Sequence, residues 1–470
     1  MKGKRLFTVC LLLVISQSTI YGQDEIISPP EHGMGLVMNE EACMAIPQQP
    51  TLVTRDYKVL PRSFSLKKYC PTPKSQREFG TCTSWASGYA ARTIAEAVRN
   101  GWTDSLTINS EAFSPLFVYA QIKSEGDLEC RQGSRPDLAM KLLKEKGCAK
   151  FKSFDVYCAD YISQDLFNEA ENFKIDDYFT LFNCYENNPD TKIEKIKKAI
   201  SESCPVVISM HIYPSFGKDK YMWNGDMTLG ENEKPGYHAM TVVGYDDDRS
   251  AFQIMNSWGS DWCDGGFIWV RYEDFAKTVD WAWELYVANK QPKNELSGSL
   301  EMQLATGEIM EPILADGDGT LTHYRIKGAF SSGTRYRAYI TNNEPAYVYM
   351  IGADKLNNVT KVFPPKDNIS PALVYKSTHV AIPNEKFYIQ LDNTVGTDYM
   401  CVLYCTEPID IEDVISQVRK QNGDFYTNLT NVLGNSLSSK TDITYKVDKI
   451  DFKAKTDKKI VPLLVEFTHN

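Results

Sequence analysis

The chain has 470 residues, 43% of them hydrophobic, and a net charge of −10 from 51 basic and 61 acidic side chains. This length and composition predict two or three domains with packed cores. A chain this acidic, with no basic run, binds nucleic acid poorly, so we exclude nucleic acid as a partner.

The first 22 residues predict a secretory signal peptide. Three basic residues come first, Lys2, Lys4 and Arg5. An apolar stretch then runs from Leu6 to about Ile15, and a polar segment ends at Gly22. This apolar stretch is short of the roughly 20 residues of a membrane helix. We therefore expect an exported protein, secreted, periplasmic or at the cell surface, without a transmembrane segment in the mature chain. A lipoprotein attached through Cys10 is the weaker alternative.

Residues 23–58 are punctuated by prolines, with Pro29-Pro30 and Pro47. This composition predicts either an arm packed along the next domain or a short propeptide.

The stretch from Gln76 to Ala97 predicts a helix with Cys82 at its start. Apolar residues recur at three- and four-residue intervals and Asn100-Gly101 closes the helix; the apolar set is Trp85, Ala86, Tyr89, Ala90, Ile94, Ala97 and Val98. A thiol in the first turn lies near the positive end of the helix dipole, which favours the nucleophilic thiolate. Cys82 is therefore a candidate nucleophile, and an ordinary buried helix cysteine is the alternative.

Further along, residues 115–121, 137–144 and 193–201 predict helices, and residues 205–210 predict a buried strand followed by a structural or surface histidine, His211. Two short apolar runs come next. Residues 236–245 place His238 at the head of one strand, and residues 252–259 place Asn256 and Trp258 at the end of another. A hairpin of these two runs would bring His238 beside Asn256.

Gln76, Cys82, His238 and Asn256, in this order and with these flanks, resemble the papain-like cysteine peptidases. The resemblance covers roughly residues 60–290, and the combination of GTC, HAMTVVGY and NSWG makes it specific. It implies an α+β papain-like fold of two subdomains, a helical half and a β-barrel-like half, over residues 59–290. Papain-like zymogens usually carry a longer helical pro-region, which favours the arm for residues 23–58.

The resemblance also implies a role for each residue. Cys82 would be the nucleophile, and His238 its general base and then acid. Asn256 would accept the other imidazole proton, under the shield of Trp258. The backbone N–H of Cys82 and the amide of Gln76 would hold the developing oxyanion.

Two positions depart from the family's pattern. Thr83 follows the nucleophile where an aromatic residue is usual, and Phe79 replaces a cysteine, so the usual disulfide cannot form from position 79. Neither group is the base or the oxyanion donor. Residues 130–136 lie where the family lines its substrate cleft, which makes Gly133 and Pro136 candidate substrate-binding residues; a helix-initiating turn is an equally good interpretation.

Apart from Cys10 and Cys82, the chain has ten cysteines, a number that permits disulfides without giving their connectivity. Cys401 and Cys405, if on one strand, would lie about 13 Å apart at roughly 3.3 Å per residue, too far to bridge. The chain lacks a CxxC pair and its six histidines are scattered, so we expect no metal and no cofactor.

Residues 291–300 predict a linker, and residues 301–470 a β-rich C-terminal domain with terminal helices. Its expected elements are a hairpin of residues 336–340 and 346–351 around Asn342-Asn343, strands at 387–391 and 399–404, and a helix at 411–420. This part resembles a small domain of unknown function of bacterial secreted and surface proteins, in its tyrosine-rich hairpin and in residues 362–365 and 396–399. Residues 316–319 hint at a calcium loop, but a turn fits better. A surface partner is one possible role for the domain.

Together these features predict an exported bacterial cysteine endopeptidase that hydrolyses protein or peptide substrates through an acyl-enzyme. Two alternatives stay open: a papain-like binding scaffold without activity, and a transamidase that uses the same Cys-His pair.

Overall fold

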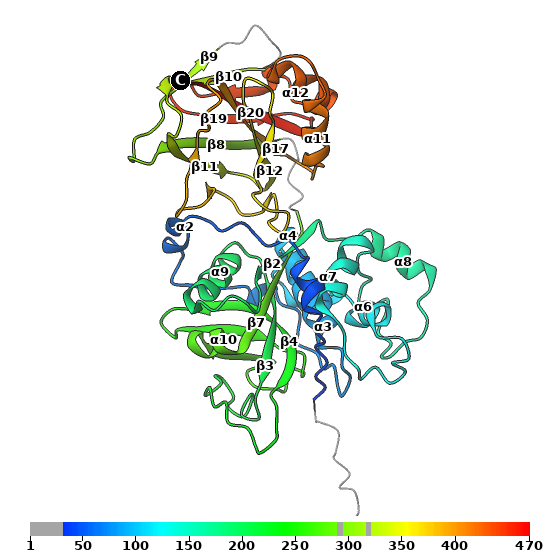
Figure 1. The fold of residues 1–470 in the computed structure, drawn as a ribbon. Helices are drawn as coiled ribbons and strands as arrows, with labels where there is room; N and C mark the ends of the chain where they lie inside the picture. The colour runs from blue at the N-terminus through cyan, green and yellow to red at the C-terminus, as the bar shows by residue number, and fades with distance from the viewer. Residues whose placement is uncertain (1–31, 289–294, 316–320) are drawn as a thin grey trace, which may run out of the picture.

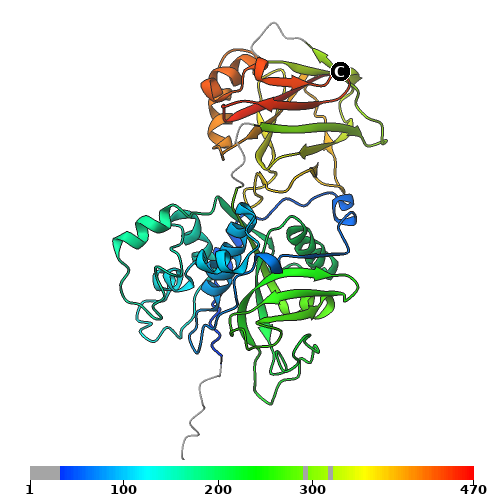
Figure 2. The ribbon, with the colours of Figure 1, turned by 180° about the vertical axis from the view of Figure 1, so that it is seen from behind.

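The computed structural model describes residues 32–288, 295–315 and 321–470 (Figure 1). The expected signal peptide, the start of the arm and the candidate calcium loop at 316–319 lie outside these residues. Within the described ranges, no helix is long and apolar enough to cross a membrane. Figures 1 and 2 show two bodies, with residues up to 288 in one and the C-terminal residues in the other; helix α2 (Thr54–Lys58) of the arm lies at their junction.

The first body has a helical half and a sheet half. Its other helices are α1 (Glu40–Met44), α3 (Cys82–Ser84), α4 (Arg92–Asn100), α5 (Ser105–Ser110), α6 (Pro115–Ile122), α7 (Pro136–Glu145), α8 (Gln164–Glu171), α9 (Pro189–Ser201) and α10 (Tyr272–Thr278), with a 3-10 turn η1 (Lys67–Tyr69) and a π-helical segment η2 (Trp85–Ala91). The segments α3, η2 and α4 form one continuous helix that ends at Gly101, whose φ is +69°. The helices expected at 82–100, 115–121, 137–144 and 193–201 are therefore confirmed.

The sheet half is an antiparallel sheet of order β2-β7-β3-β4-β5-β6, with β1 added on β4. Its strands are β1 (Ser63–Ser65), β2 (Asp177–Phe182), β3 (Val206–Ile212), β4 (Gly236–Asp246), β5 (Ala251–Met255), β6 (Phe267–Arg271) and β7 (Val279–Tyr286). Helix α9 packs against β2, β3 and β4, while α3 and η2 pack against β4. Strand β4 is therefore buried on both sides, which explains its unbroken apolar run.

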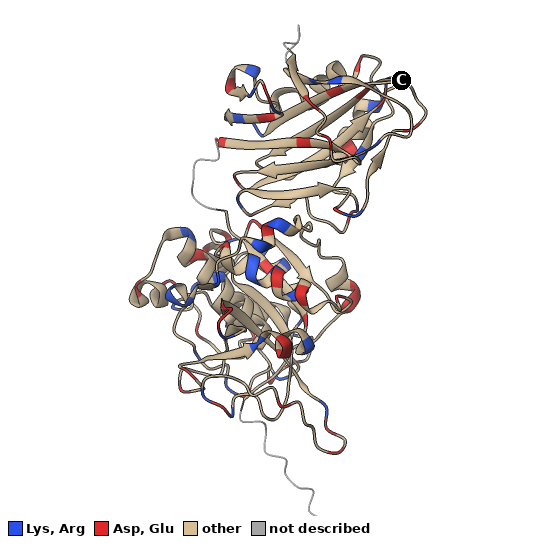
Figure 3. Ribbon diagram, turned by 90° about the vertical axis from the view of Figure 1, so that its left-hand side faces the viewer, with Lys and Arg blue, Asp and Glu red and all other residues tan. Residues whose placement is uncertain are grey.

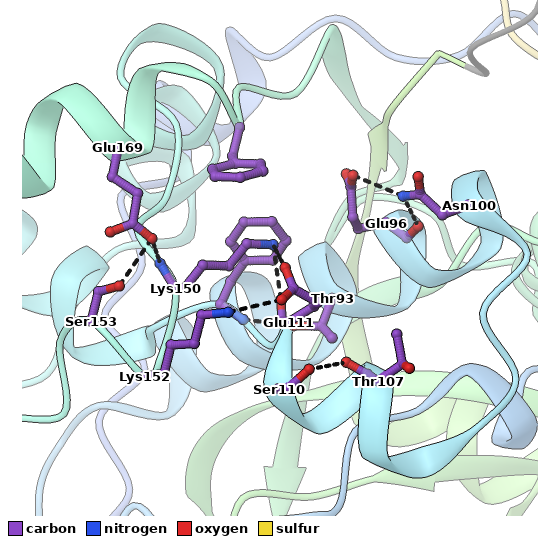
Figure 4. A network of polar contacts seen from close by, with 12 residues as sticks. Thr93, Glu96, Asn100, Thr107, Ser110, Glu111, Lys150, Lys152, Ser153 and Glu169 are labelled. Carbon is purple, nitrogen blue, oxygen red and sulfur yellow. Dashed lines mark hydrogen bonds and ion pairs between the residues drawn. The ribbon is translucent and has the colours of Figure 1, made fainter.

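Inside the helical half, contacts of Lys150 connect neighbouring segments of the chain. The ammonium of Lys150, 3% exposed, donates to the carbonyl of Glu111 at 2.9 Å and lies 3.8 Å from the ring centre of Phe113 (Figure 4). The backbone N–H of Lys150 donates to Glu169 of α8 at 3.0 Å. Burial lowers the pKa of Lys150, but its contacts hold neighbouring segments together and give it a structural role.

The C-terminal domain is a two-sheet sandwich over the part of it that the structure describes. One sheet has the order β13-β12-β17-β20-β10-β9, with β14 on β12, and the other β15-β11-β8-β19-β18, with β16 on β11. The strands are β8 (Glu295–Leu304), β9 (Pro312–Ala315), β10 (His323–Phe330), β11 (Arg335–Asn342), β12 (Ala346–Ala353), β13 (Thr360–Phe363), β14 (Ala372–Leu373), β15 (Thr378–Ile382), β16 (Ile389–Gln390), β17 (Gly396–Cys405), β18 (Ile443–Tyr445), β19 (Asp451–Lys455) and β20 (Ile460–His469). Figure 3 shows acidic and basic residues interspersed along the chain in both bodies.

Helices α11 (Ile411–Arg419) and α12 (Phe425–Leu433) cover the outer face of the first sheet. Along β17, Cys401, Leu403 and Cys405 face these helices, whereas Val402 and Tyr404 face the other sheet. This double burial accounts for the continuous apolar sequence of the strand. Cys401 and Cys405 are free and buried, as expected.

Several expectations for this domain were wrong. Residues 295–300 belong to β8 rather than to a linker, because buried residues alternate along it. Strands β11 and β12 do not form a hairpin: the turn between them carries the chain from one sheet to the other, and the Asn342 side chain there donates to the carbonyls of Leu373 and Tyr375. The helices are not terminal, since β18, β19 and β20 follow them, and the strand expected at 387–391 is reduced to β16.

Candidate active site

Cys82 is the first residue of α3 and is completely buried. Its helix packs against α6 and α7 on one side and against β4 on the other. A hydrogen bond joins this helix to β4, from the Thr241 hydroxyl to the Ala86 carbonyl at 3.0 Å. Since Thr241 lies three residues after His238, this bond aligns the strand of His238 with the helix of Cys82.

His238 and Asn256 meet as the hairpin predicts, with Nε2 and Oδ1 2.8 Å apart. The backbone N–H of Ser257 donates to the same Oδ1 at 2.7 Å, which orients the Asn256 amide with its oxygen toward the ring. Nε2 of His238 then carries the proton, and Nδ1 keeps a lone pair. Nδ1 has no hydrogen-bond partner among the described residues. The Trp258 ring lies 4.9 Å from the imidazole and shields the pair.

Gln76 is also completely buried, and both ends of its amide are held. Its Oε1 accepts a hydrogen bond of 2.5 Å from the Ser257 hydroxyl, while its Nε2 donates to the Phe79 carbonyl at 2.7 Å. The Ser257 contact fixes which end of the amide donates. Sequence reasoning missed Ser257, although it lies between Asn256 and Trp258.

Three contacts hold the loop of residues 130–136, which we call the cleft loop. A disulfide joins Cys130 to Cys158, the Tyr119 hydroxyl lies 3.3 Å from the Gly133 carbonyl, and the Thr83 hydroxyl donates to the Ser134 carbonyl at 3.1 Å. Thr83 thus connects the loop to the helix of Cys82. Pro136 is the first residue of α7, in agreement with the helix-initiating interpretation.

Residues 32–37 of the arm cross the site without forming a helix or a strand, apart from an isolated β-bridge at Leu36, and we call them the covering segment. Leu36 pairs in parallel with Ser134, with hydrogen bonds from Ser134 N–H to the Gly35 carbonyl at 2.8 Å and from Val37 N–H to the Ser134 carbonyl at 3.1 Å. Leu36 N–H also donates to the Tyr237 carbonyl, next to His238, at 3.4 Å. The segment therefore spans both walls of the cleft.

Two glycines let the covering segment lie this close. A Cβ atom on Gly33 would lie 2.1 Å from the Phe79 carbonyl oxygen, and one on Gly35 would lie 2.3 Å from the Gly80 carbonyl oxygen. Gly133 has a φ of +84°, and a Cβ atom on it would lie 2.3 Å from the Gly35 carbonyl oxygen. The arm thus packs along the first body and covers Cys82.

Covering the site changes the ionisation of both groups. Burial raises the pKa of the Cys82 thiol, although backbone hydrogen bonds from Ala239 and Gly35 oppose it. Burial lowers the pKa of His238 to about 4. Near neutral pH both groups are therefore neutral in the covered site. The helix dipole was expected to favour the Cys82 thiolate. In the covered site, burial away from water outweighs this effect and the pKa of the thiol is raised.

With this geometry in view, comparison with known proteins is decisive. Residues 67–281 match the family model described as papain family cysteine protease. This part of the chain is similar to that family. Residues 329–408 match a domain of unknown function, DUF4384. The family match supports cysteine peptidase activity and the α+β papain-like fold, and it confirms the resemblance seen in the sequence.

The similar proteins cover only part of this chain. An uncharacterized peptidase C1-like protein of Acanthamoeba polyphaga mimivirus is 24% identical over 229 residues, 46% of this chain and 71% of that protein. Cathepsin B-like CP2 of Giardia intestinalis is 26% identical over 44% of this chain and 68% of its own length. Zingipain-2 of Zingiber officinale is 31% identical over 86 residues, only 37% of its length. Among solved structures, xylellain, a cysteine protease from Xylella fastidiosa, is 21% identical with a TM-score of 0.44, covering 55% of this chain and 96% of its own.

Proposed function

We propose that the chain is an exported cysteine endopeptidase that cleaves protein or peptide substrates with Cys82 as nucleophile. The observation that carries this proposal is the oriented imidazole. Asn256 holds the proton of His238 at Nε2, and the ring's free Nδ1 lies on the strand that packs against the Cys82 helix. Export rests on the basic and apolar pattern of residues 1–22.

The reaction follows from these positions. His238 Nδ1 takes the thiol proton, and the sulfur attacks the peptide carbonyl carbon. The Cys82 N–H and the Gln76 amide stabilise the oxyanion. The C–N bond breaks as His238 protonates the leaving amine, which leaves a thioester. His238 then deprotonates water, the water attacks the thioester, and the free acid and the thiol are restored.

Gly133 and Trp258 are proposed to line the substrate cleft, because both contact or flank the covering segment. The Gly133 backbone faces Gly35, and the Trp258 ring stacks on His32 with centroids 4.9 Å apart. Pro136 is proposed only to set the start of α7 behind that loop.

The test is labelling of Cys82 by an epoxysuccinyl thiol inhibitor, together with hydrolysis of a fluorogenic peptide library under reducing conditions. Cys82→Ala and His238→Ala are the matched controls. Once the covering segment is displaced from the cleft, we expect one inhibitor adduct, absent from Cys82→Ala, and hydrolysis abolished in both variants. An uncovered cleft that takes the label but cleaves no peptide would refute peptidase activity and favour the scaffold. Products in which an added amine has replaced water would favour the transamidase.

A further inference from the structure

Residues 46–56 of the arm lie between the two bodies and bond to both. Gln48 pairs in parallel with Thr180 of β2 on one side and with Ile369 of the C-terminal domain on the other. On the C-terminal side, Gln48 N–H donates to the Asn368 carbonyl and its own carbonyl accepts from Ser370 N–H, both at 2.8 Å. Gln48 of the arm is thus bridged to both domains.

The C-terminal domain also grips the start of α2. Asp56, 6% exposed, accepts from the backbone N–H of His379 at 2.7 Å and contacts its Nδ1 at 2.9 Å. Val53 N–H donates to the His379 carbonyl at 2.9 Å. The backbone and hydroxyl of Thr54 donate to Glu385 at 2.9 and 2.6 Å. His379 and Glu385 therefore both bond to residues 53–56 of the arm.

A buried carboxyl group completes the joint. Glu284 of β7 is completely buried and accepts hydrogen bonds from Gln49 of the arm and from Tyr375 of the C-terminal domain. The three side chains come from three separate parts of the chain. A buried polar cluster of this kind is strongly destabilised when one partner leaves, so it favours a single seating of the arm.

We propose that the C-terminal domain is the anchor of an intramolecular inhibitor: by holding residues 46–56 it keeps residues 32–37 across Cys82. The proposal rests on the proposed peptidase function. In the covered site a glycine backbone lies against the thiol, and the Gly35 carbonyl oxygen is already bonded to the Ser134 N–H. The covering segment therefore occupies the site.

Anchoring also decides which cut in the arm opens the site. A tethered segment has an effective concentration in the millimolar range, and the tether here is residues 46–56. A cut between residues 38 and 39 separates the covering segment from its anchor. A cut between residues 58 and 59 separates the arm from the peptidase domain but leaves the covering segment attached to the anchor.

The experiment uses the chain from residue 23 onward with one site-specific protease sequence inserted, either between Met38 and Asn39 or between Lys58 and Val59. Met38 is only partly exposed, and the other three residues are exposed. The readout is alkylation of Cys82 by iodoacetamide, mapped by peptide mass, before and after cutting. Buried Cys148 in the same samples reports on unfolding.

We expect the first cut to raise the Cys82 alkylation rate about tenfold or more, and the second to change it less than about twofold. After the second cut, His379→Ala with Glu385→Ala should raise the rate as the first cut does. The matched control is Glu311→Ala with Lys327→Ala, which removes an exposed ion pair of the same domain. Equal effects of the two cuts, or no effect of the His379 and Glu385 changes, would overturn the anchor. Faster alkylation without peptide hydrolysis would leave the anchor in place and refute the peptidase.

Discussion

Replacing Gly35 by alanine is expected to uncover Cys82. The new Cβ would lie 2.3 to 2.5 Å from the backbone of Gly80, and backbone atoms cannot move aside as a flexible side chain can. The covering segment must shift and would lose three backbone hydrogen bonds to the cleft walls, those of Gly35, Leu36 and Val37. At about 1 kcal/mol each, the loss is about 3 kcal/mol, or about 100-fold in the population of the open site.

The assay is the second-order rate of Cys82 labelling by an epoxysuccinyl inhibitor. Gly352→Ala is the matched control, because its Cβ would meet only ordinary contacts, the nearest at 3.5 Å. Thermal melts of both variants check that the fold is kept. A labelling rate for Gly35→Ala within about threefold of the parent would show that the close approach to Gly80 does not hold the site closed.

Three further predictions concern the site and the joint. Asn256→Ala should lower kcat roughly 100-fold with little change in KM, because the imidazole loses its orientation; unchanged kcat would remove Asn256 from the mechanism. Gln76→Ala should lower kcat by about 10²- to 10³-fold through loss of an oxyanion donor, whereas a change confined to KM would give Gln76 a binding role. Burial raises the pKa of Glu284 to about 7 from 4.5, so the folded state binds the proton more tightly than the unfolded state. The contribution of Glu284 to stability is therefore full below about pH 4.5 and is lost as the pH rises through about 7, and denaturant unfolding of Glu284→Gln should lack this slope.

Local patterns in the sequence predicted the helix that begins at Cys82 and the contact between His238 and Asn256. The three- and four-residue spacing after Cys82 predicted the helix. Two neighbouring strands, one with His238 at its head and one followed by Asn256, predicted the contact at 2.8 Å. The helix follows from residue periodicity and the contact from a short connection between strands, and both features can be recognised in the sequence.

The parts that were missed depend on pairing between distant segments. Strand β11 alternates as a hairpin strand would, yet its partners are β8, β15 and β16, and β10 pairs in parallel with the far C-terminal β20. The covering segment bonds to the cleft mainly through backbone atoms. Its side chains therefore carry no sequence pattern from which its position could be predicted. Gly33 and Gly35 were the available signal, since paired glycines mark close approach of two backbones.

The double pairing of Gln48 has a consequence for solubility. Strand β2 ends the order of the peptidase sheet, and on the arm's side Thr180 is bonded to Pro47 and Gln49. An exposed edge of this kind is a template onto which a strand of another molecule can add. Loss of the arm would therefore uncover Cys82 and also expose the edge of β2. Molecules that have lost the arm are then expected to self-associate through this edge.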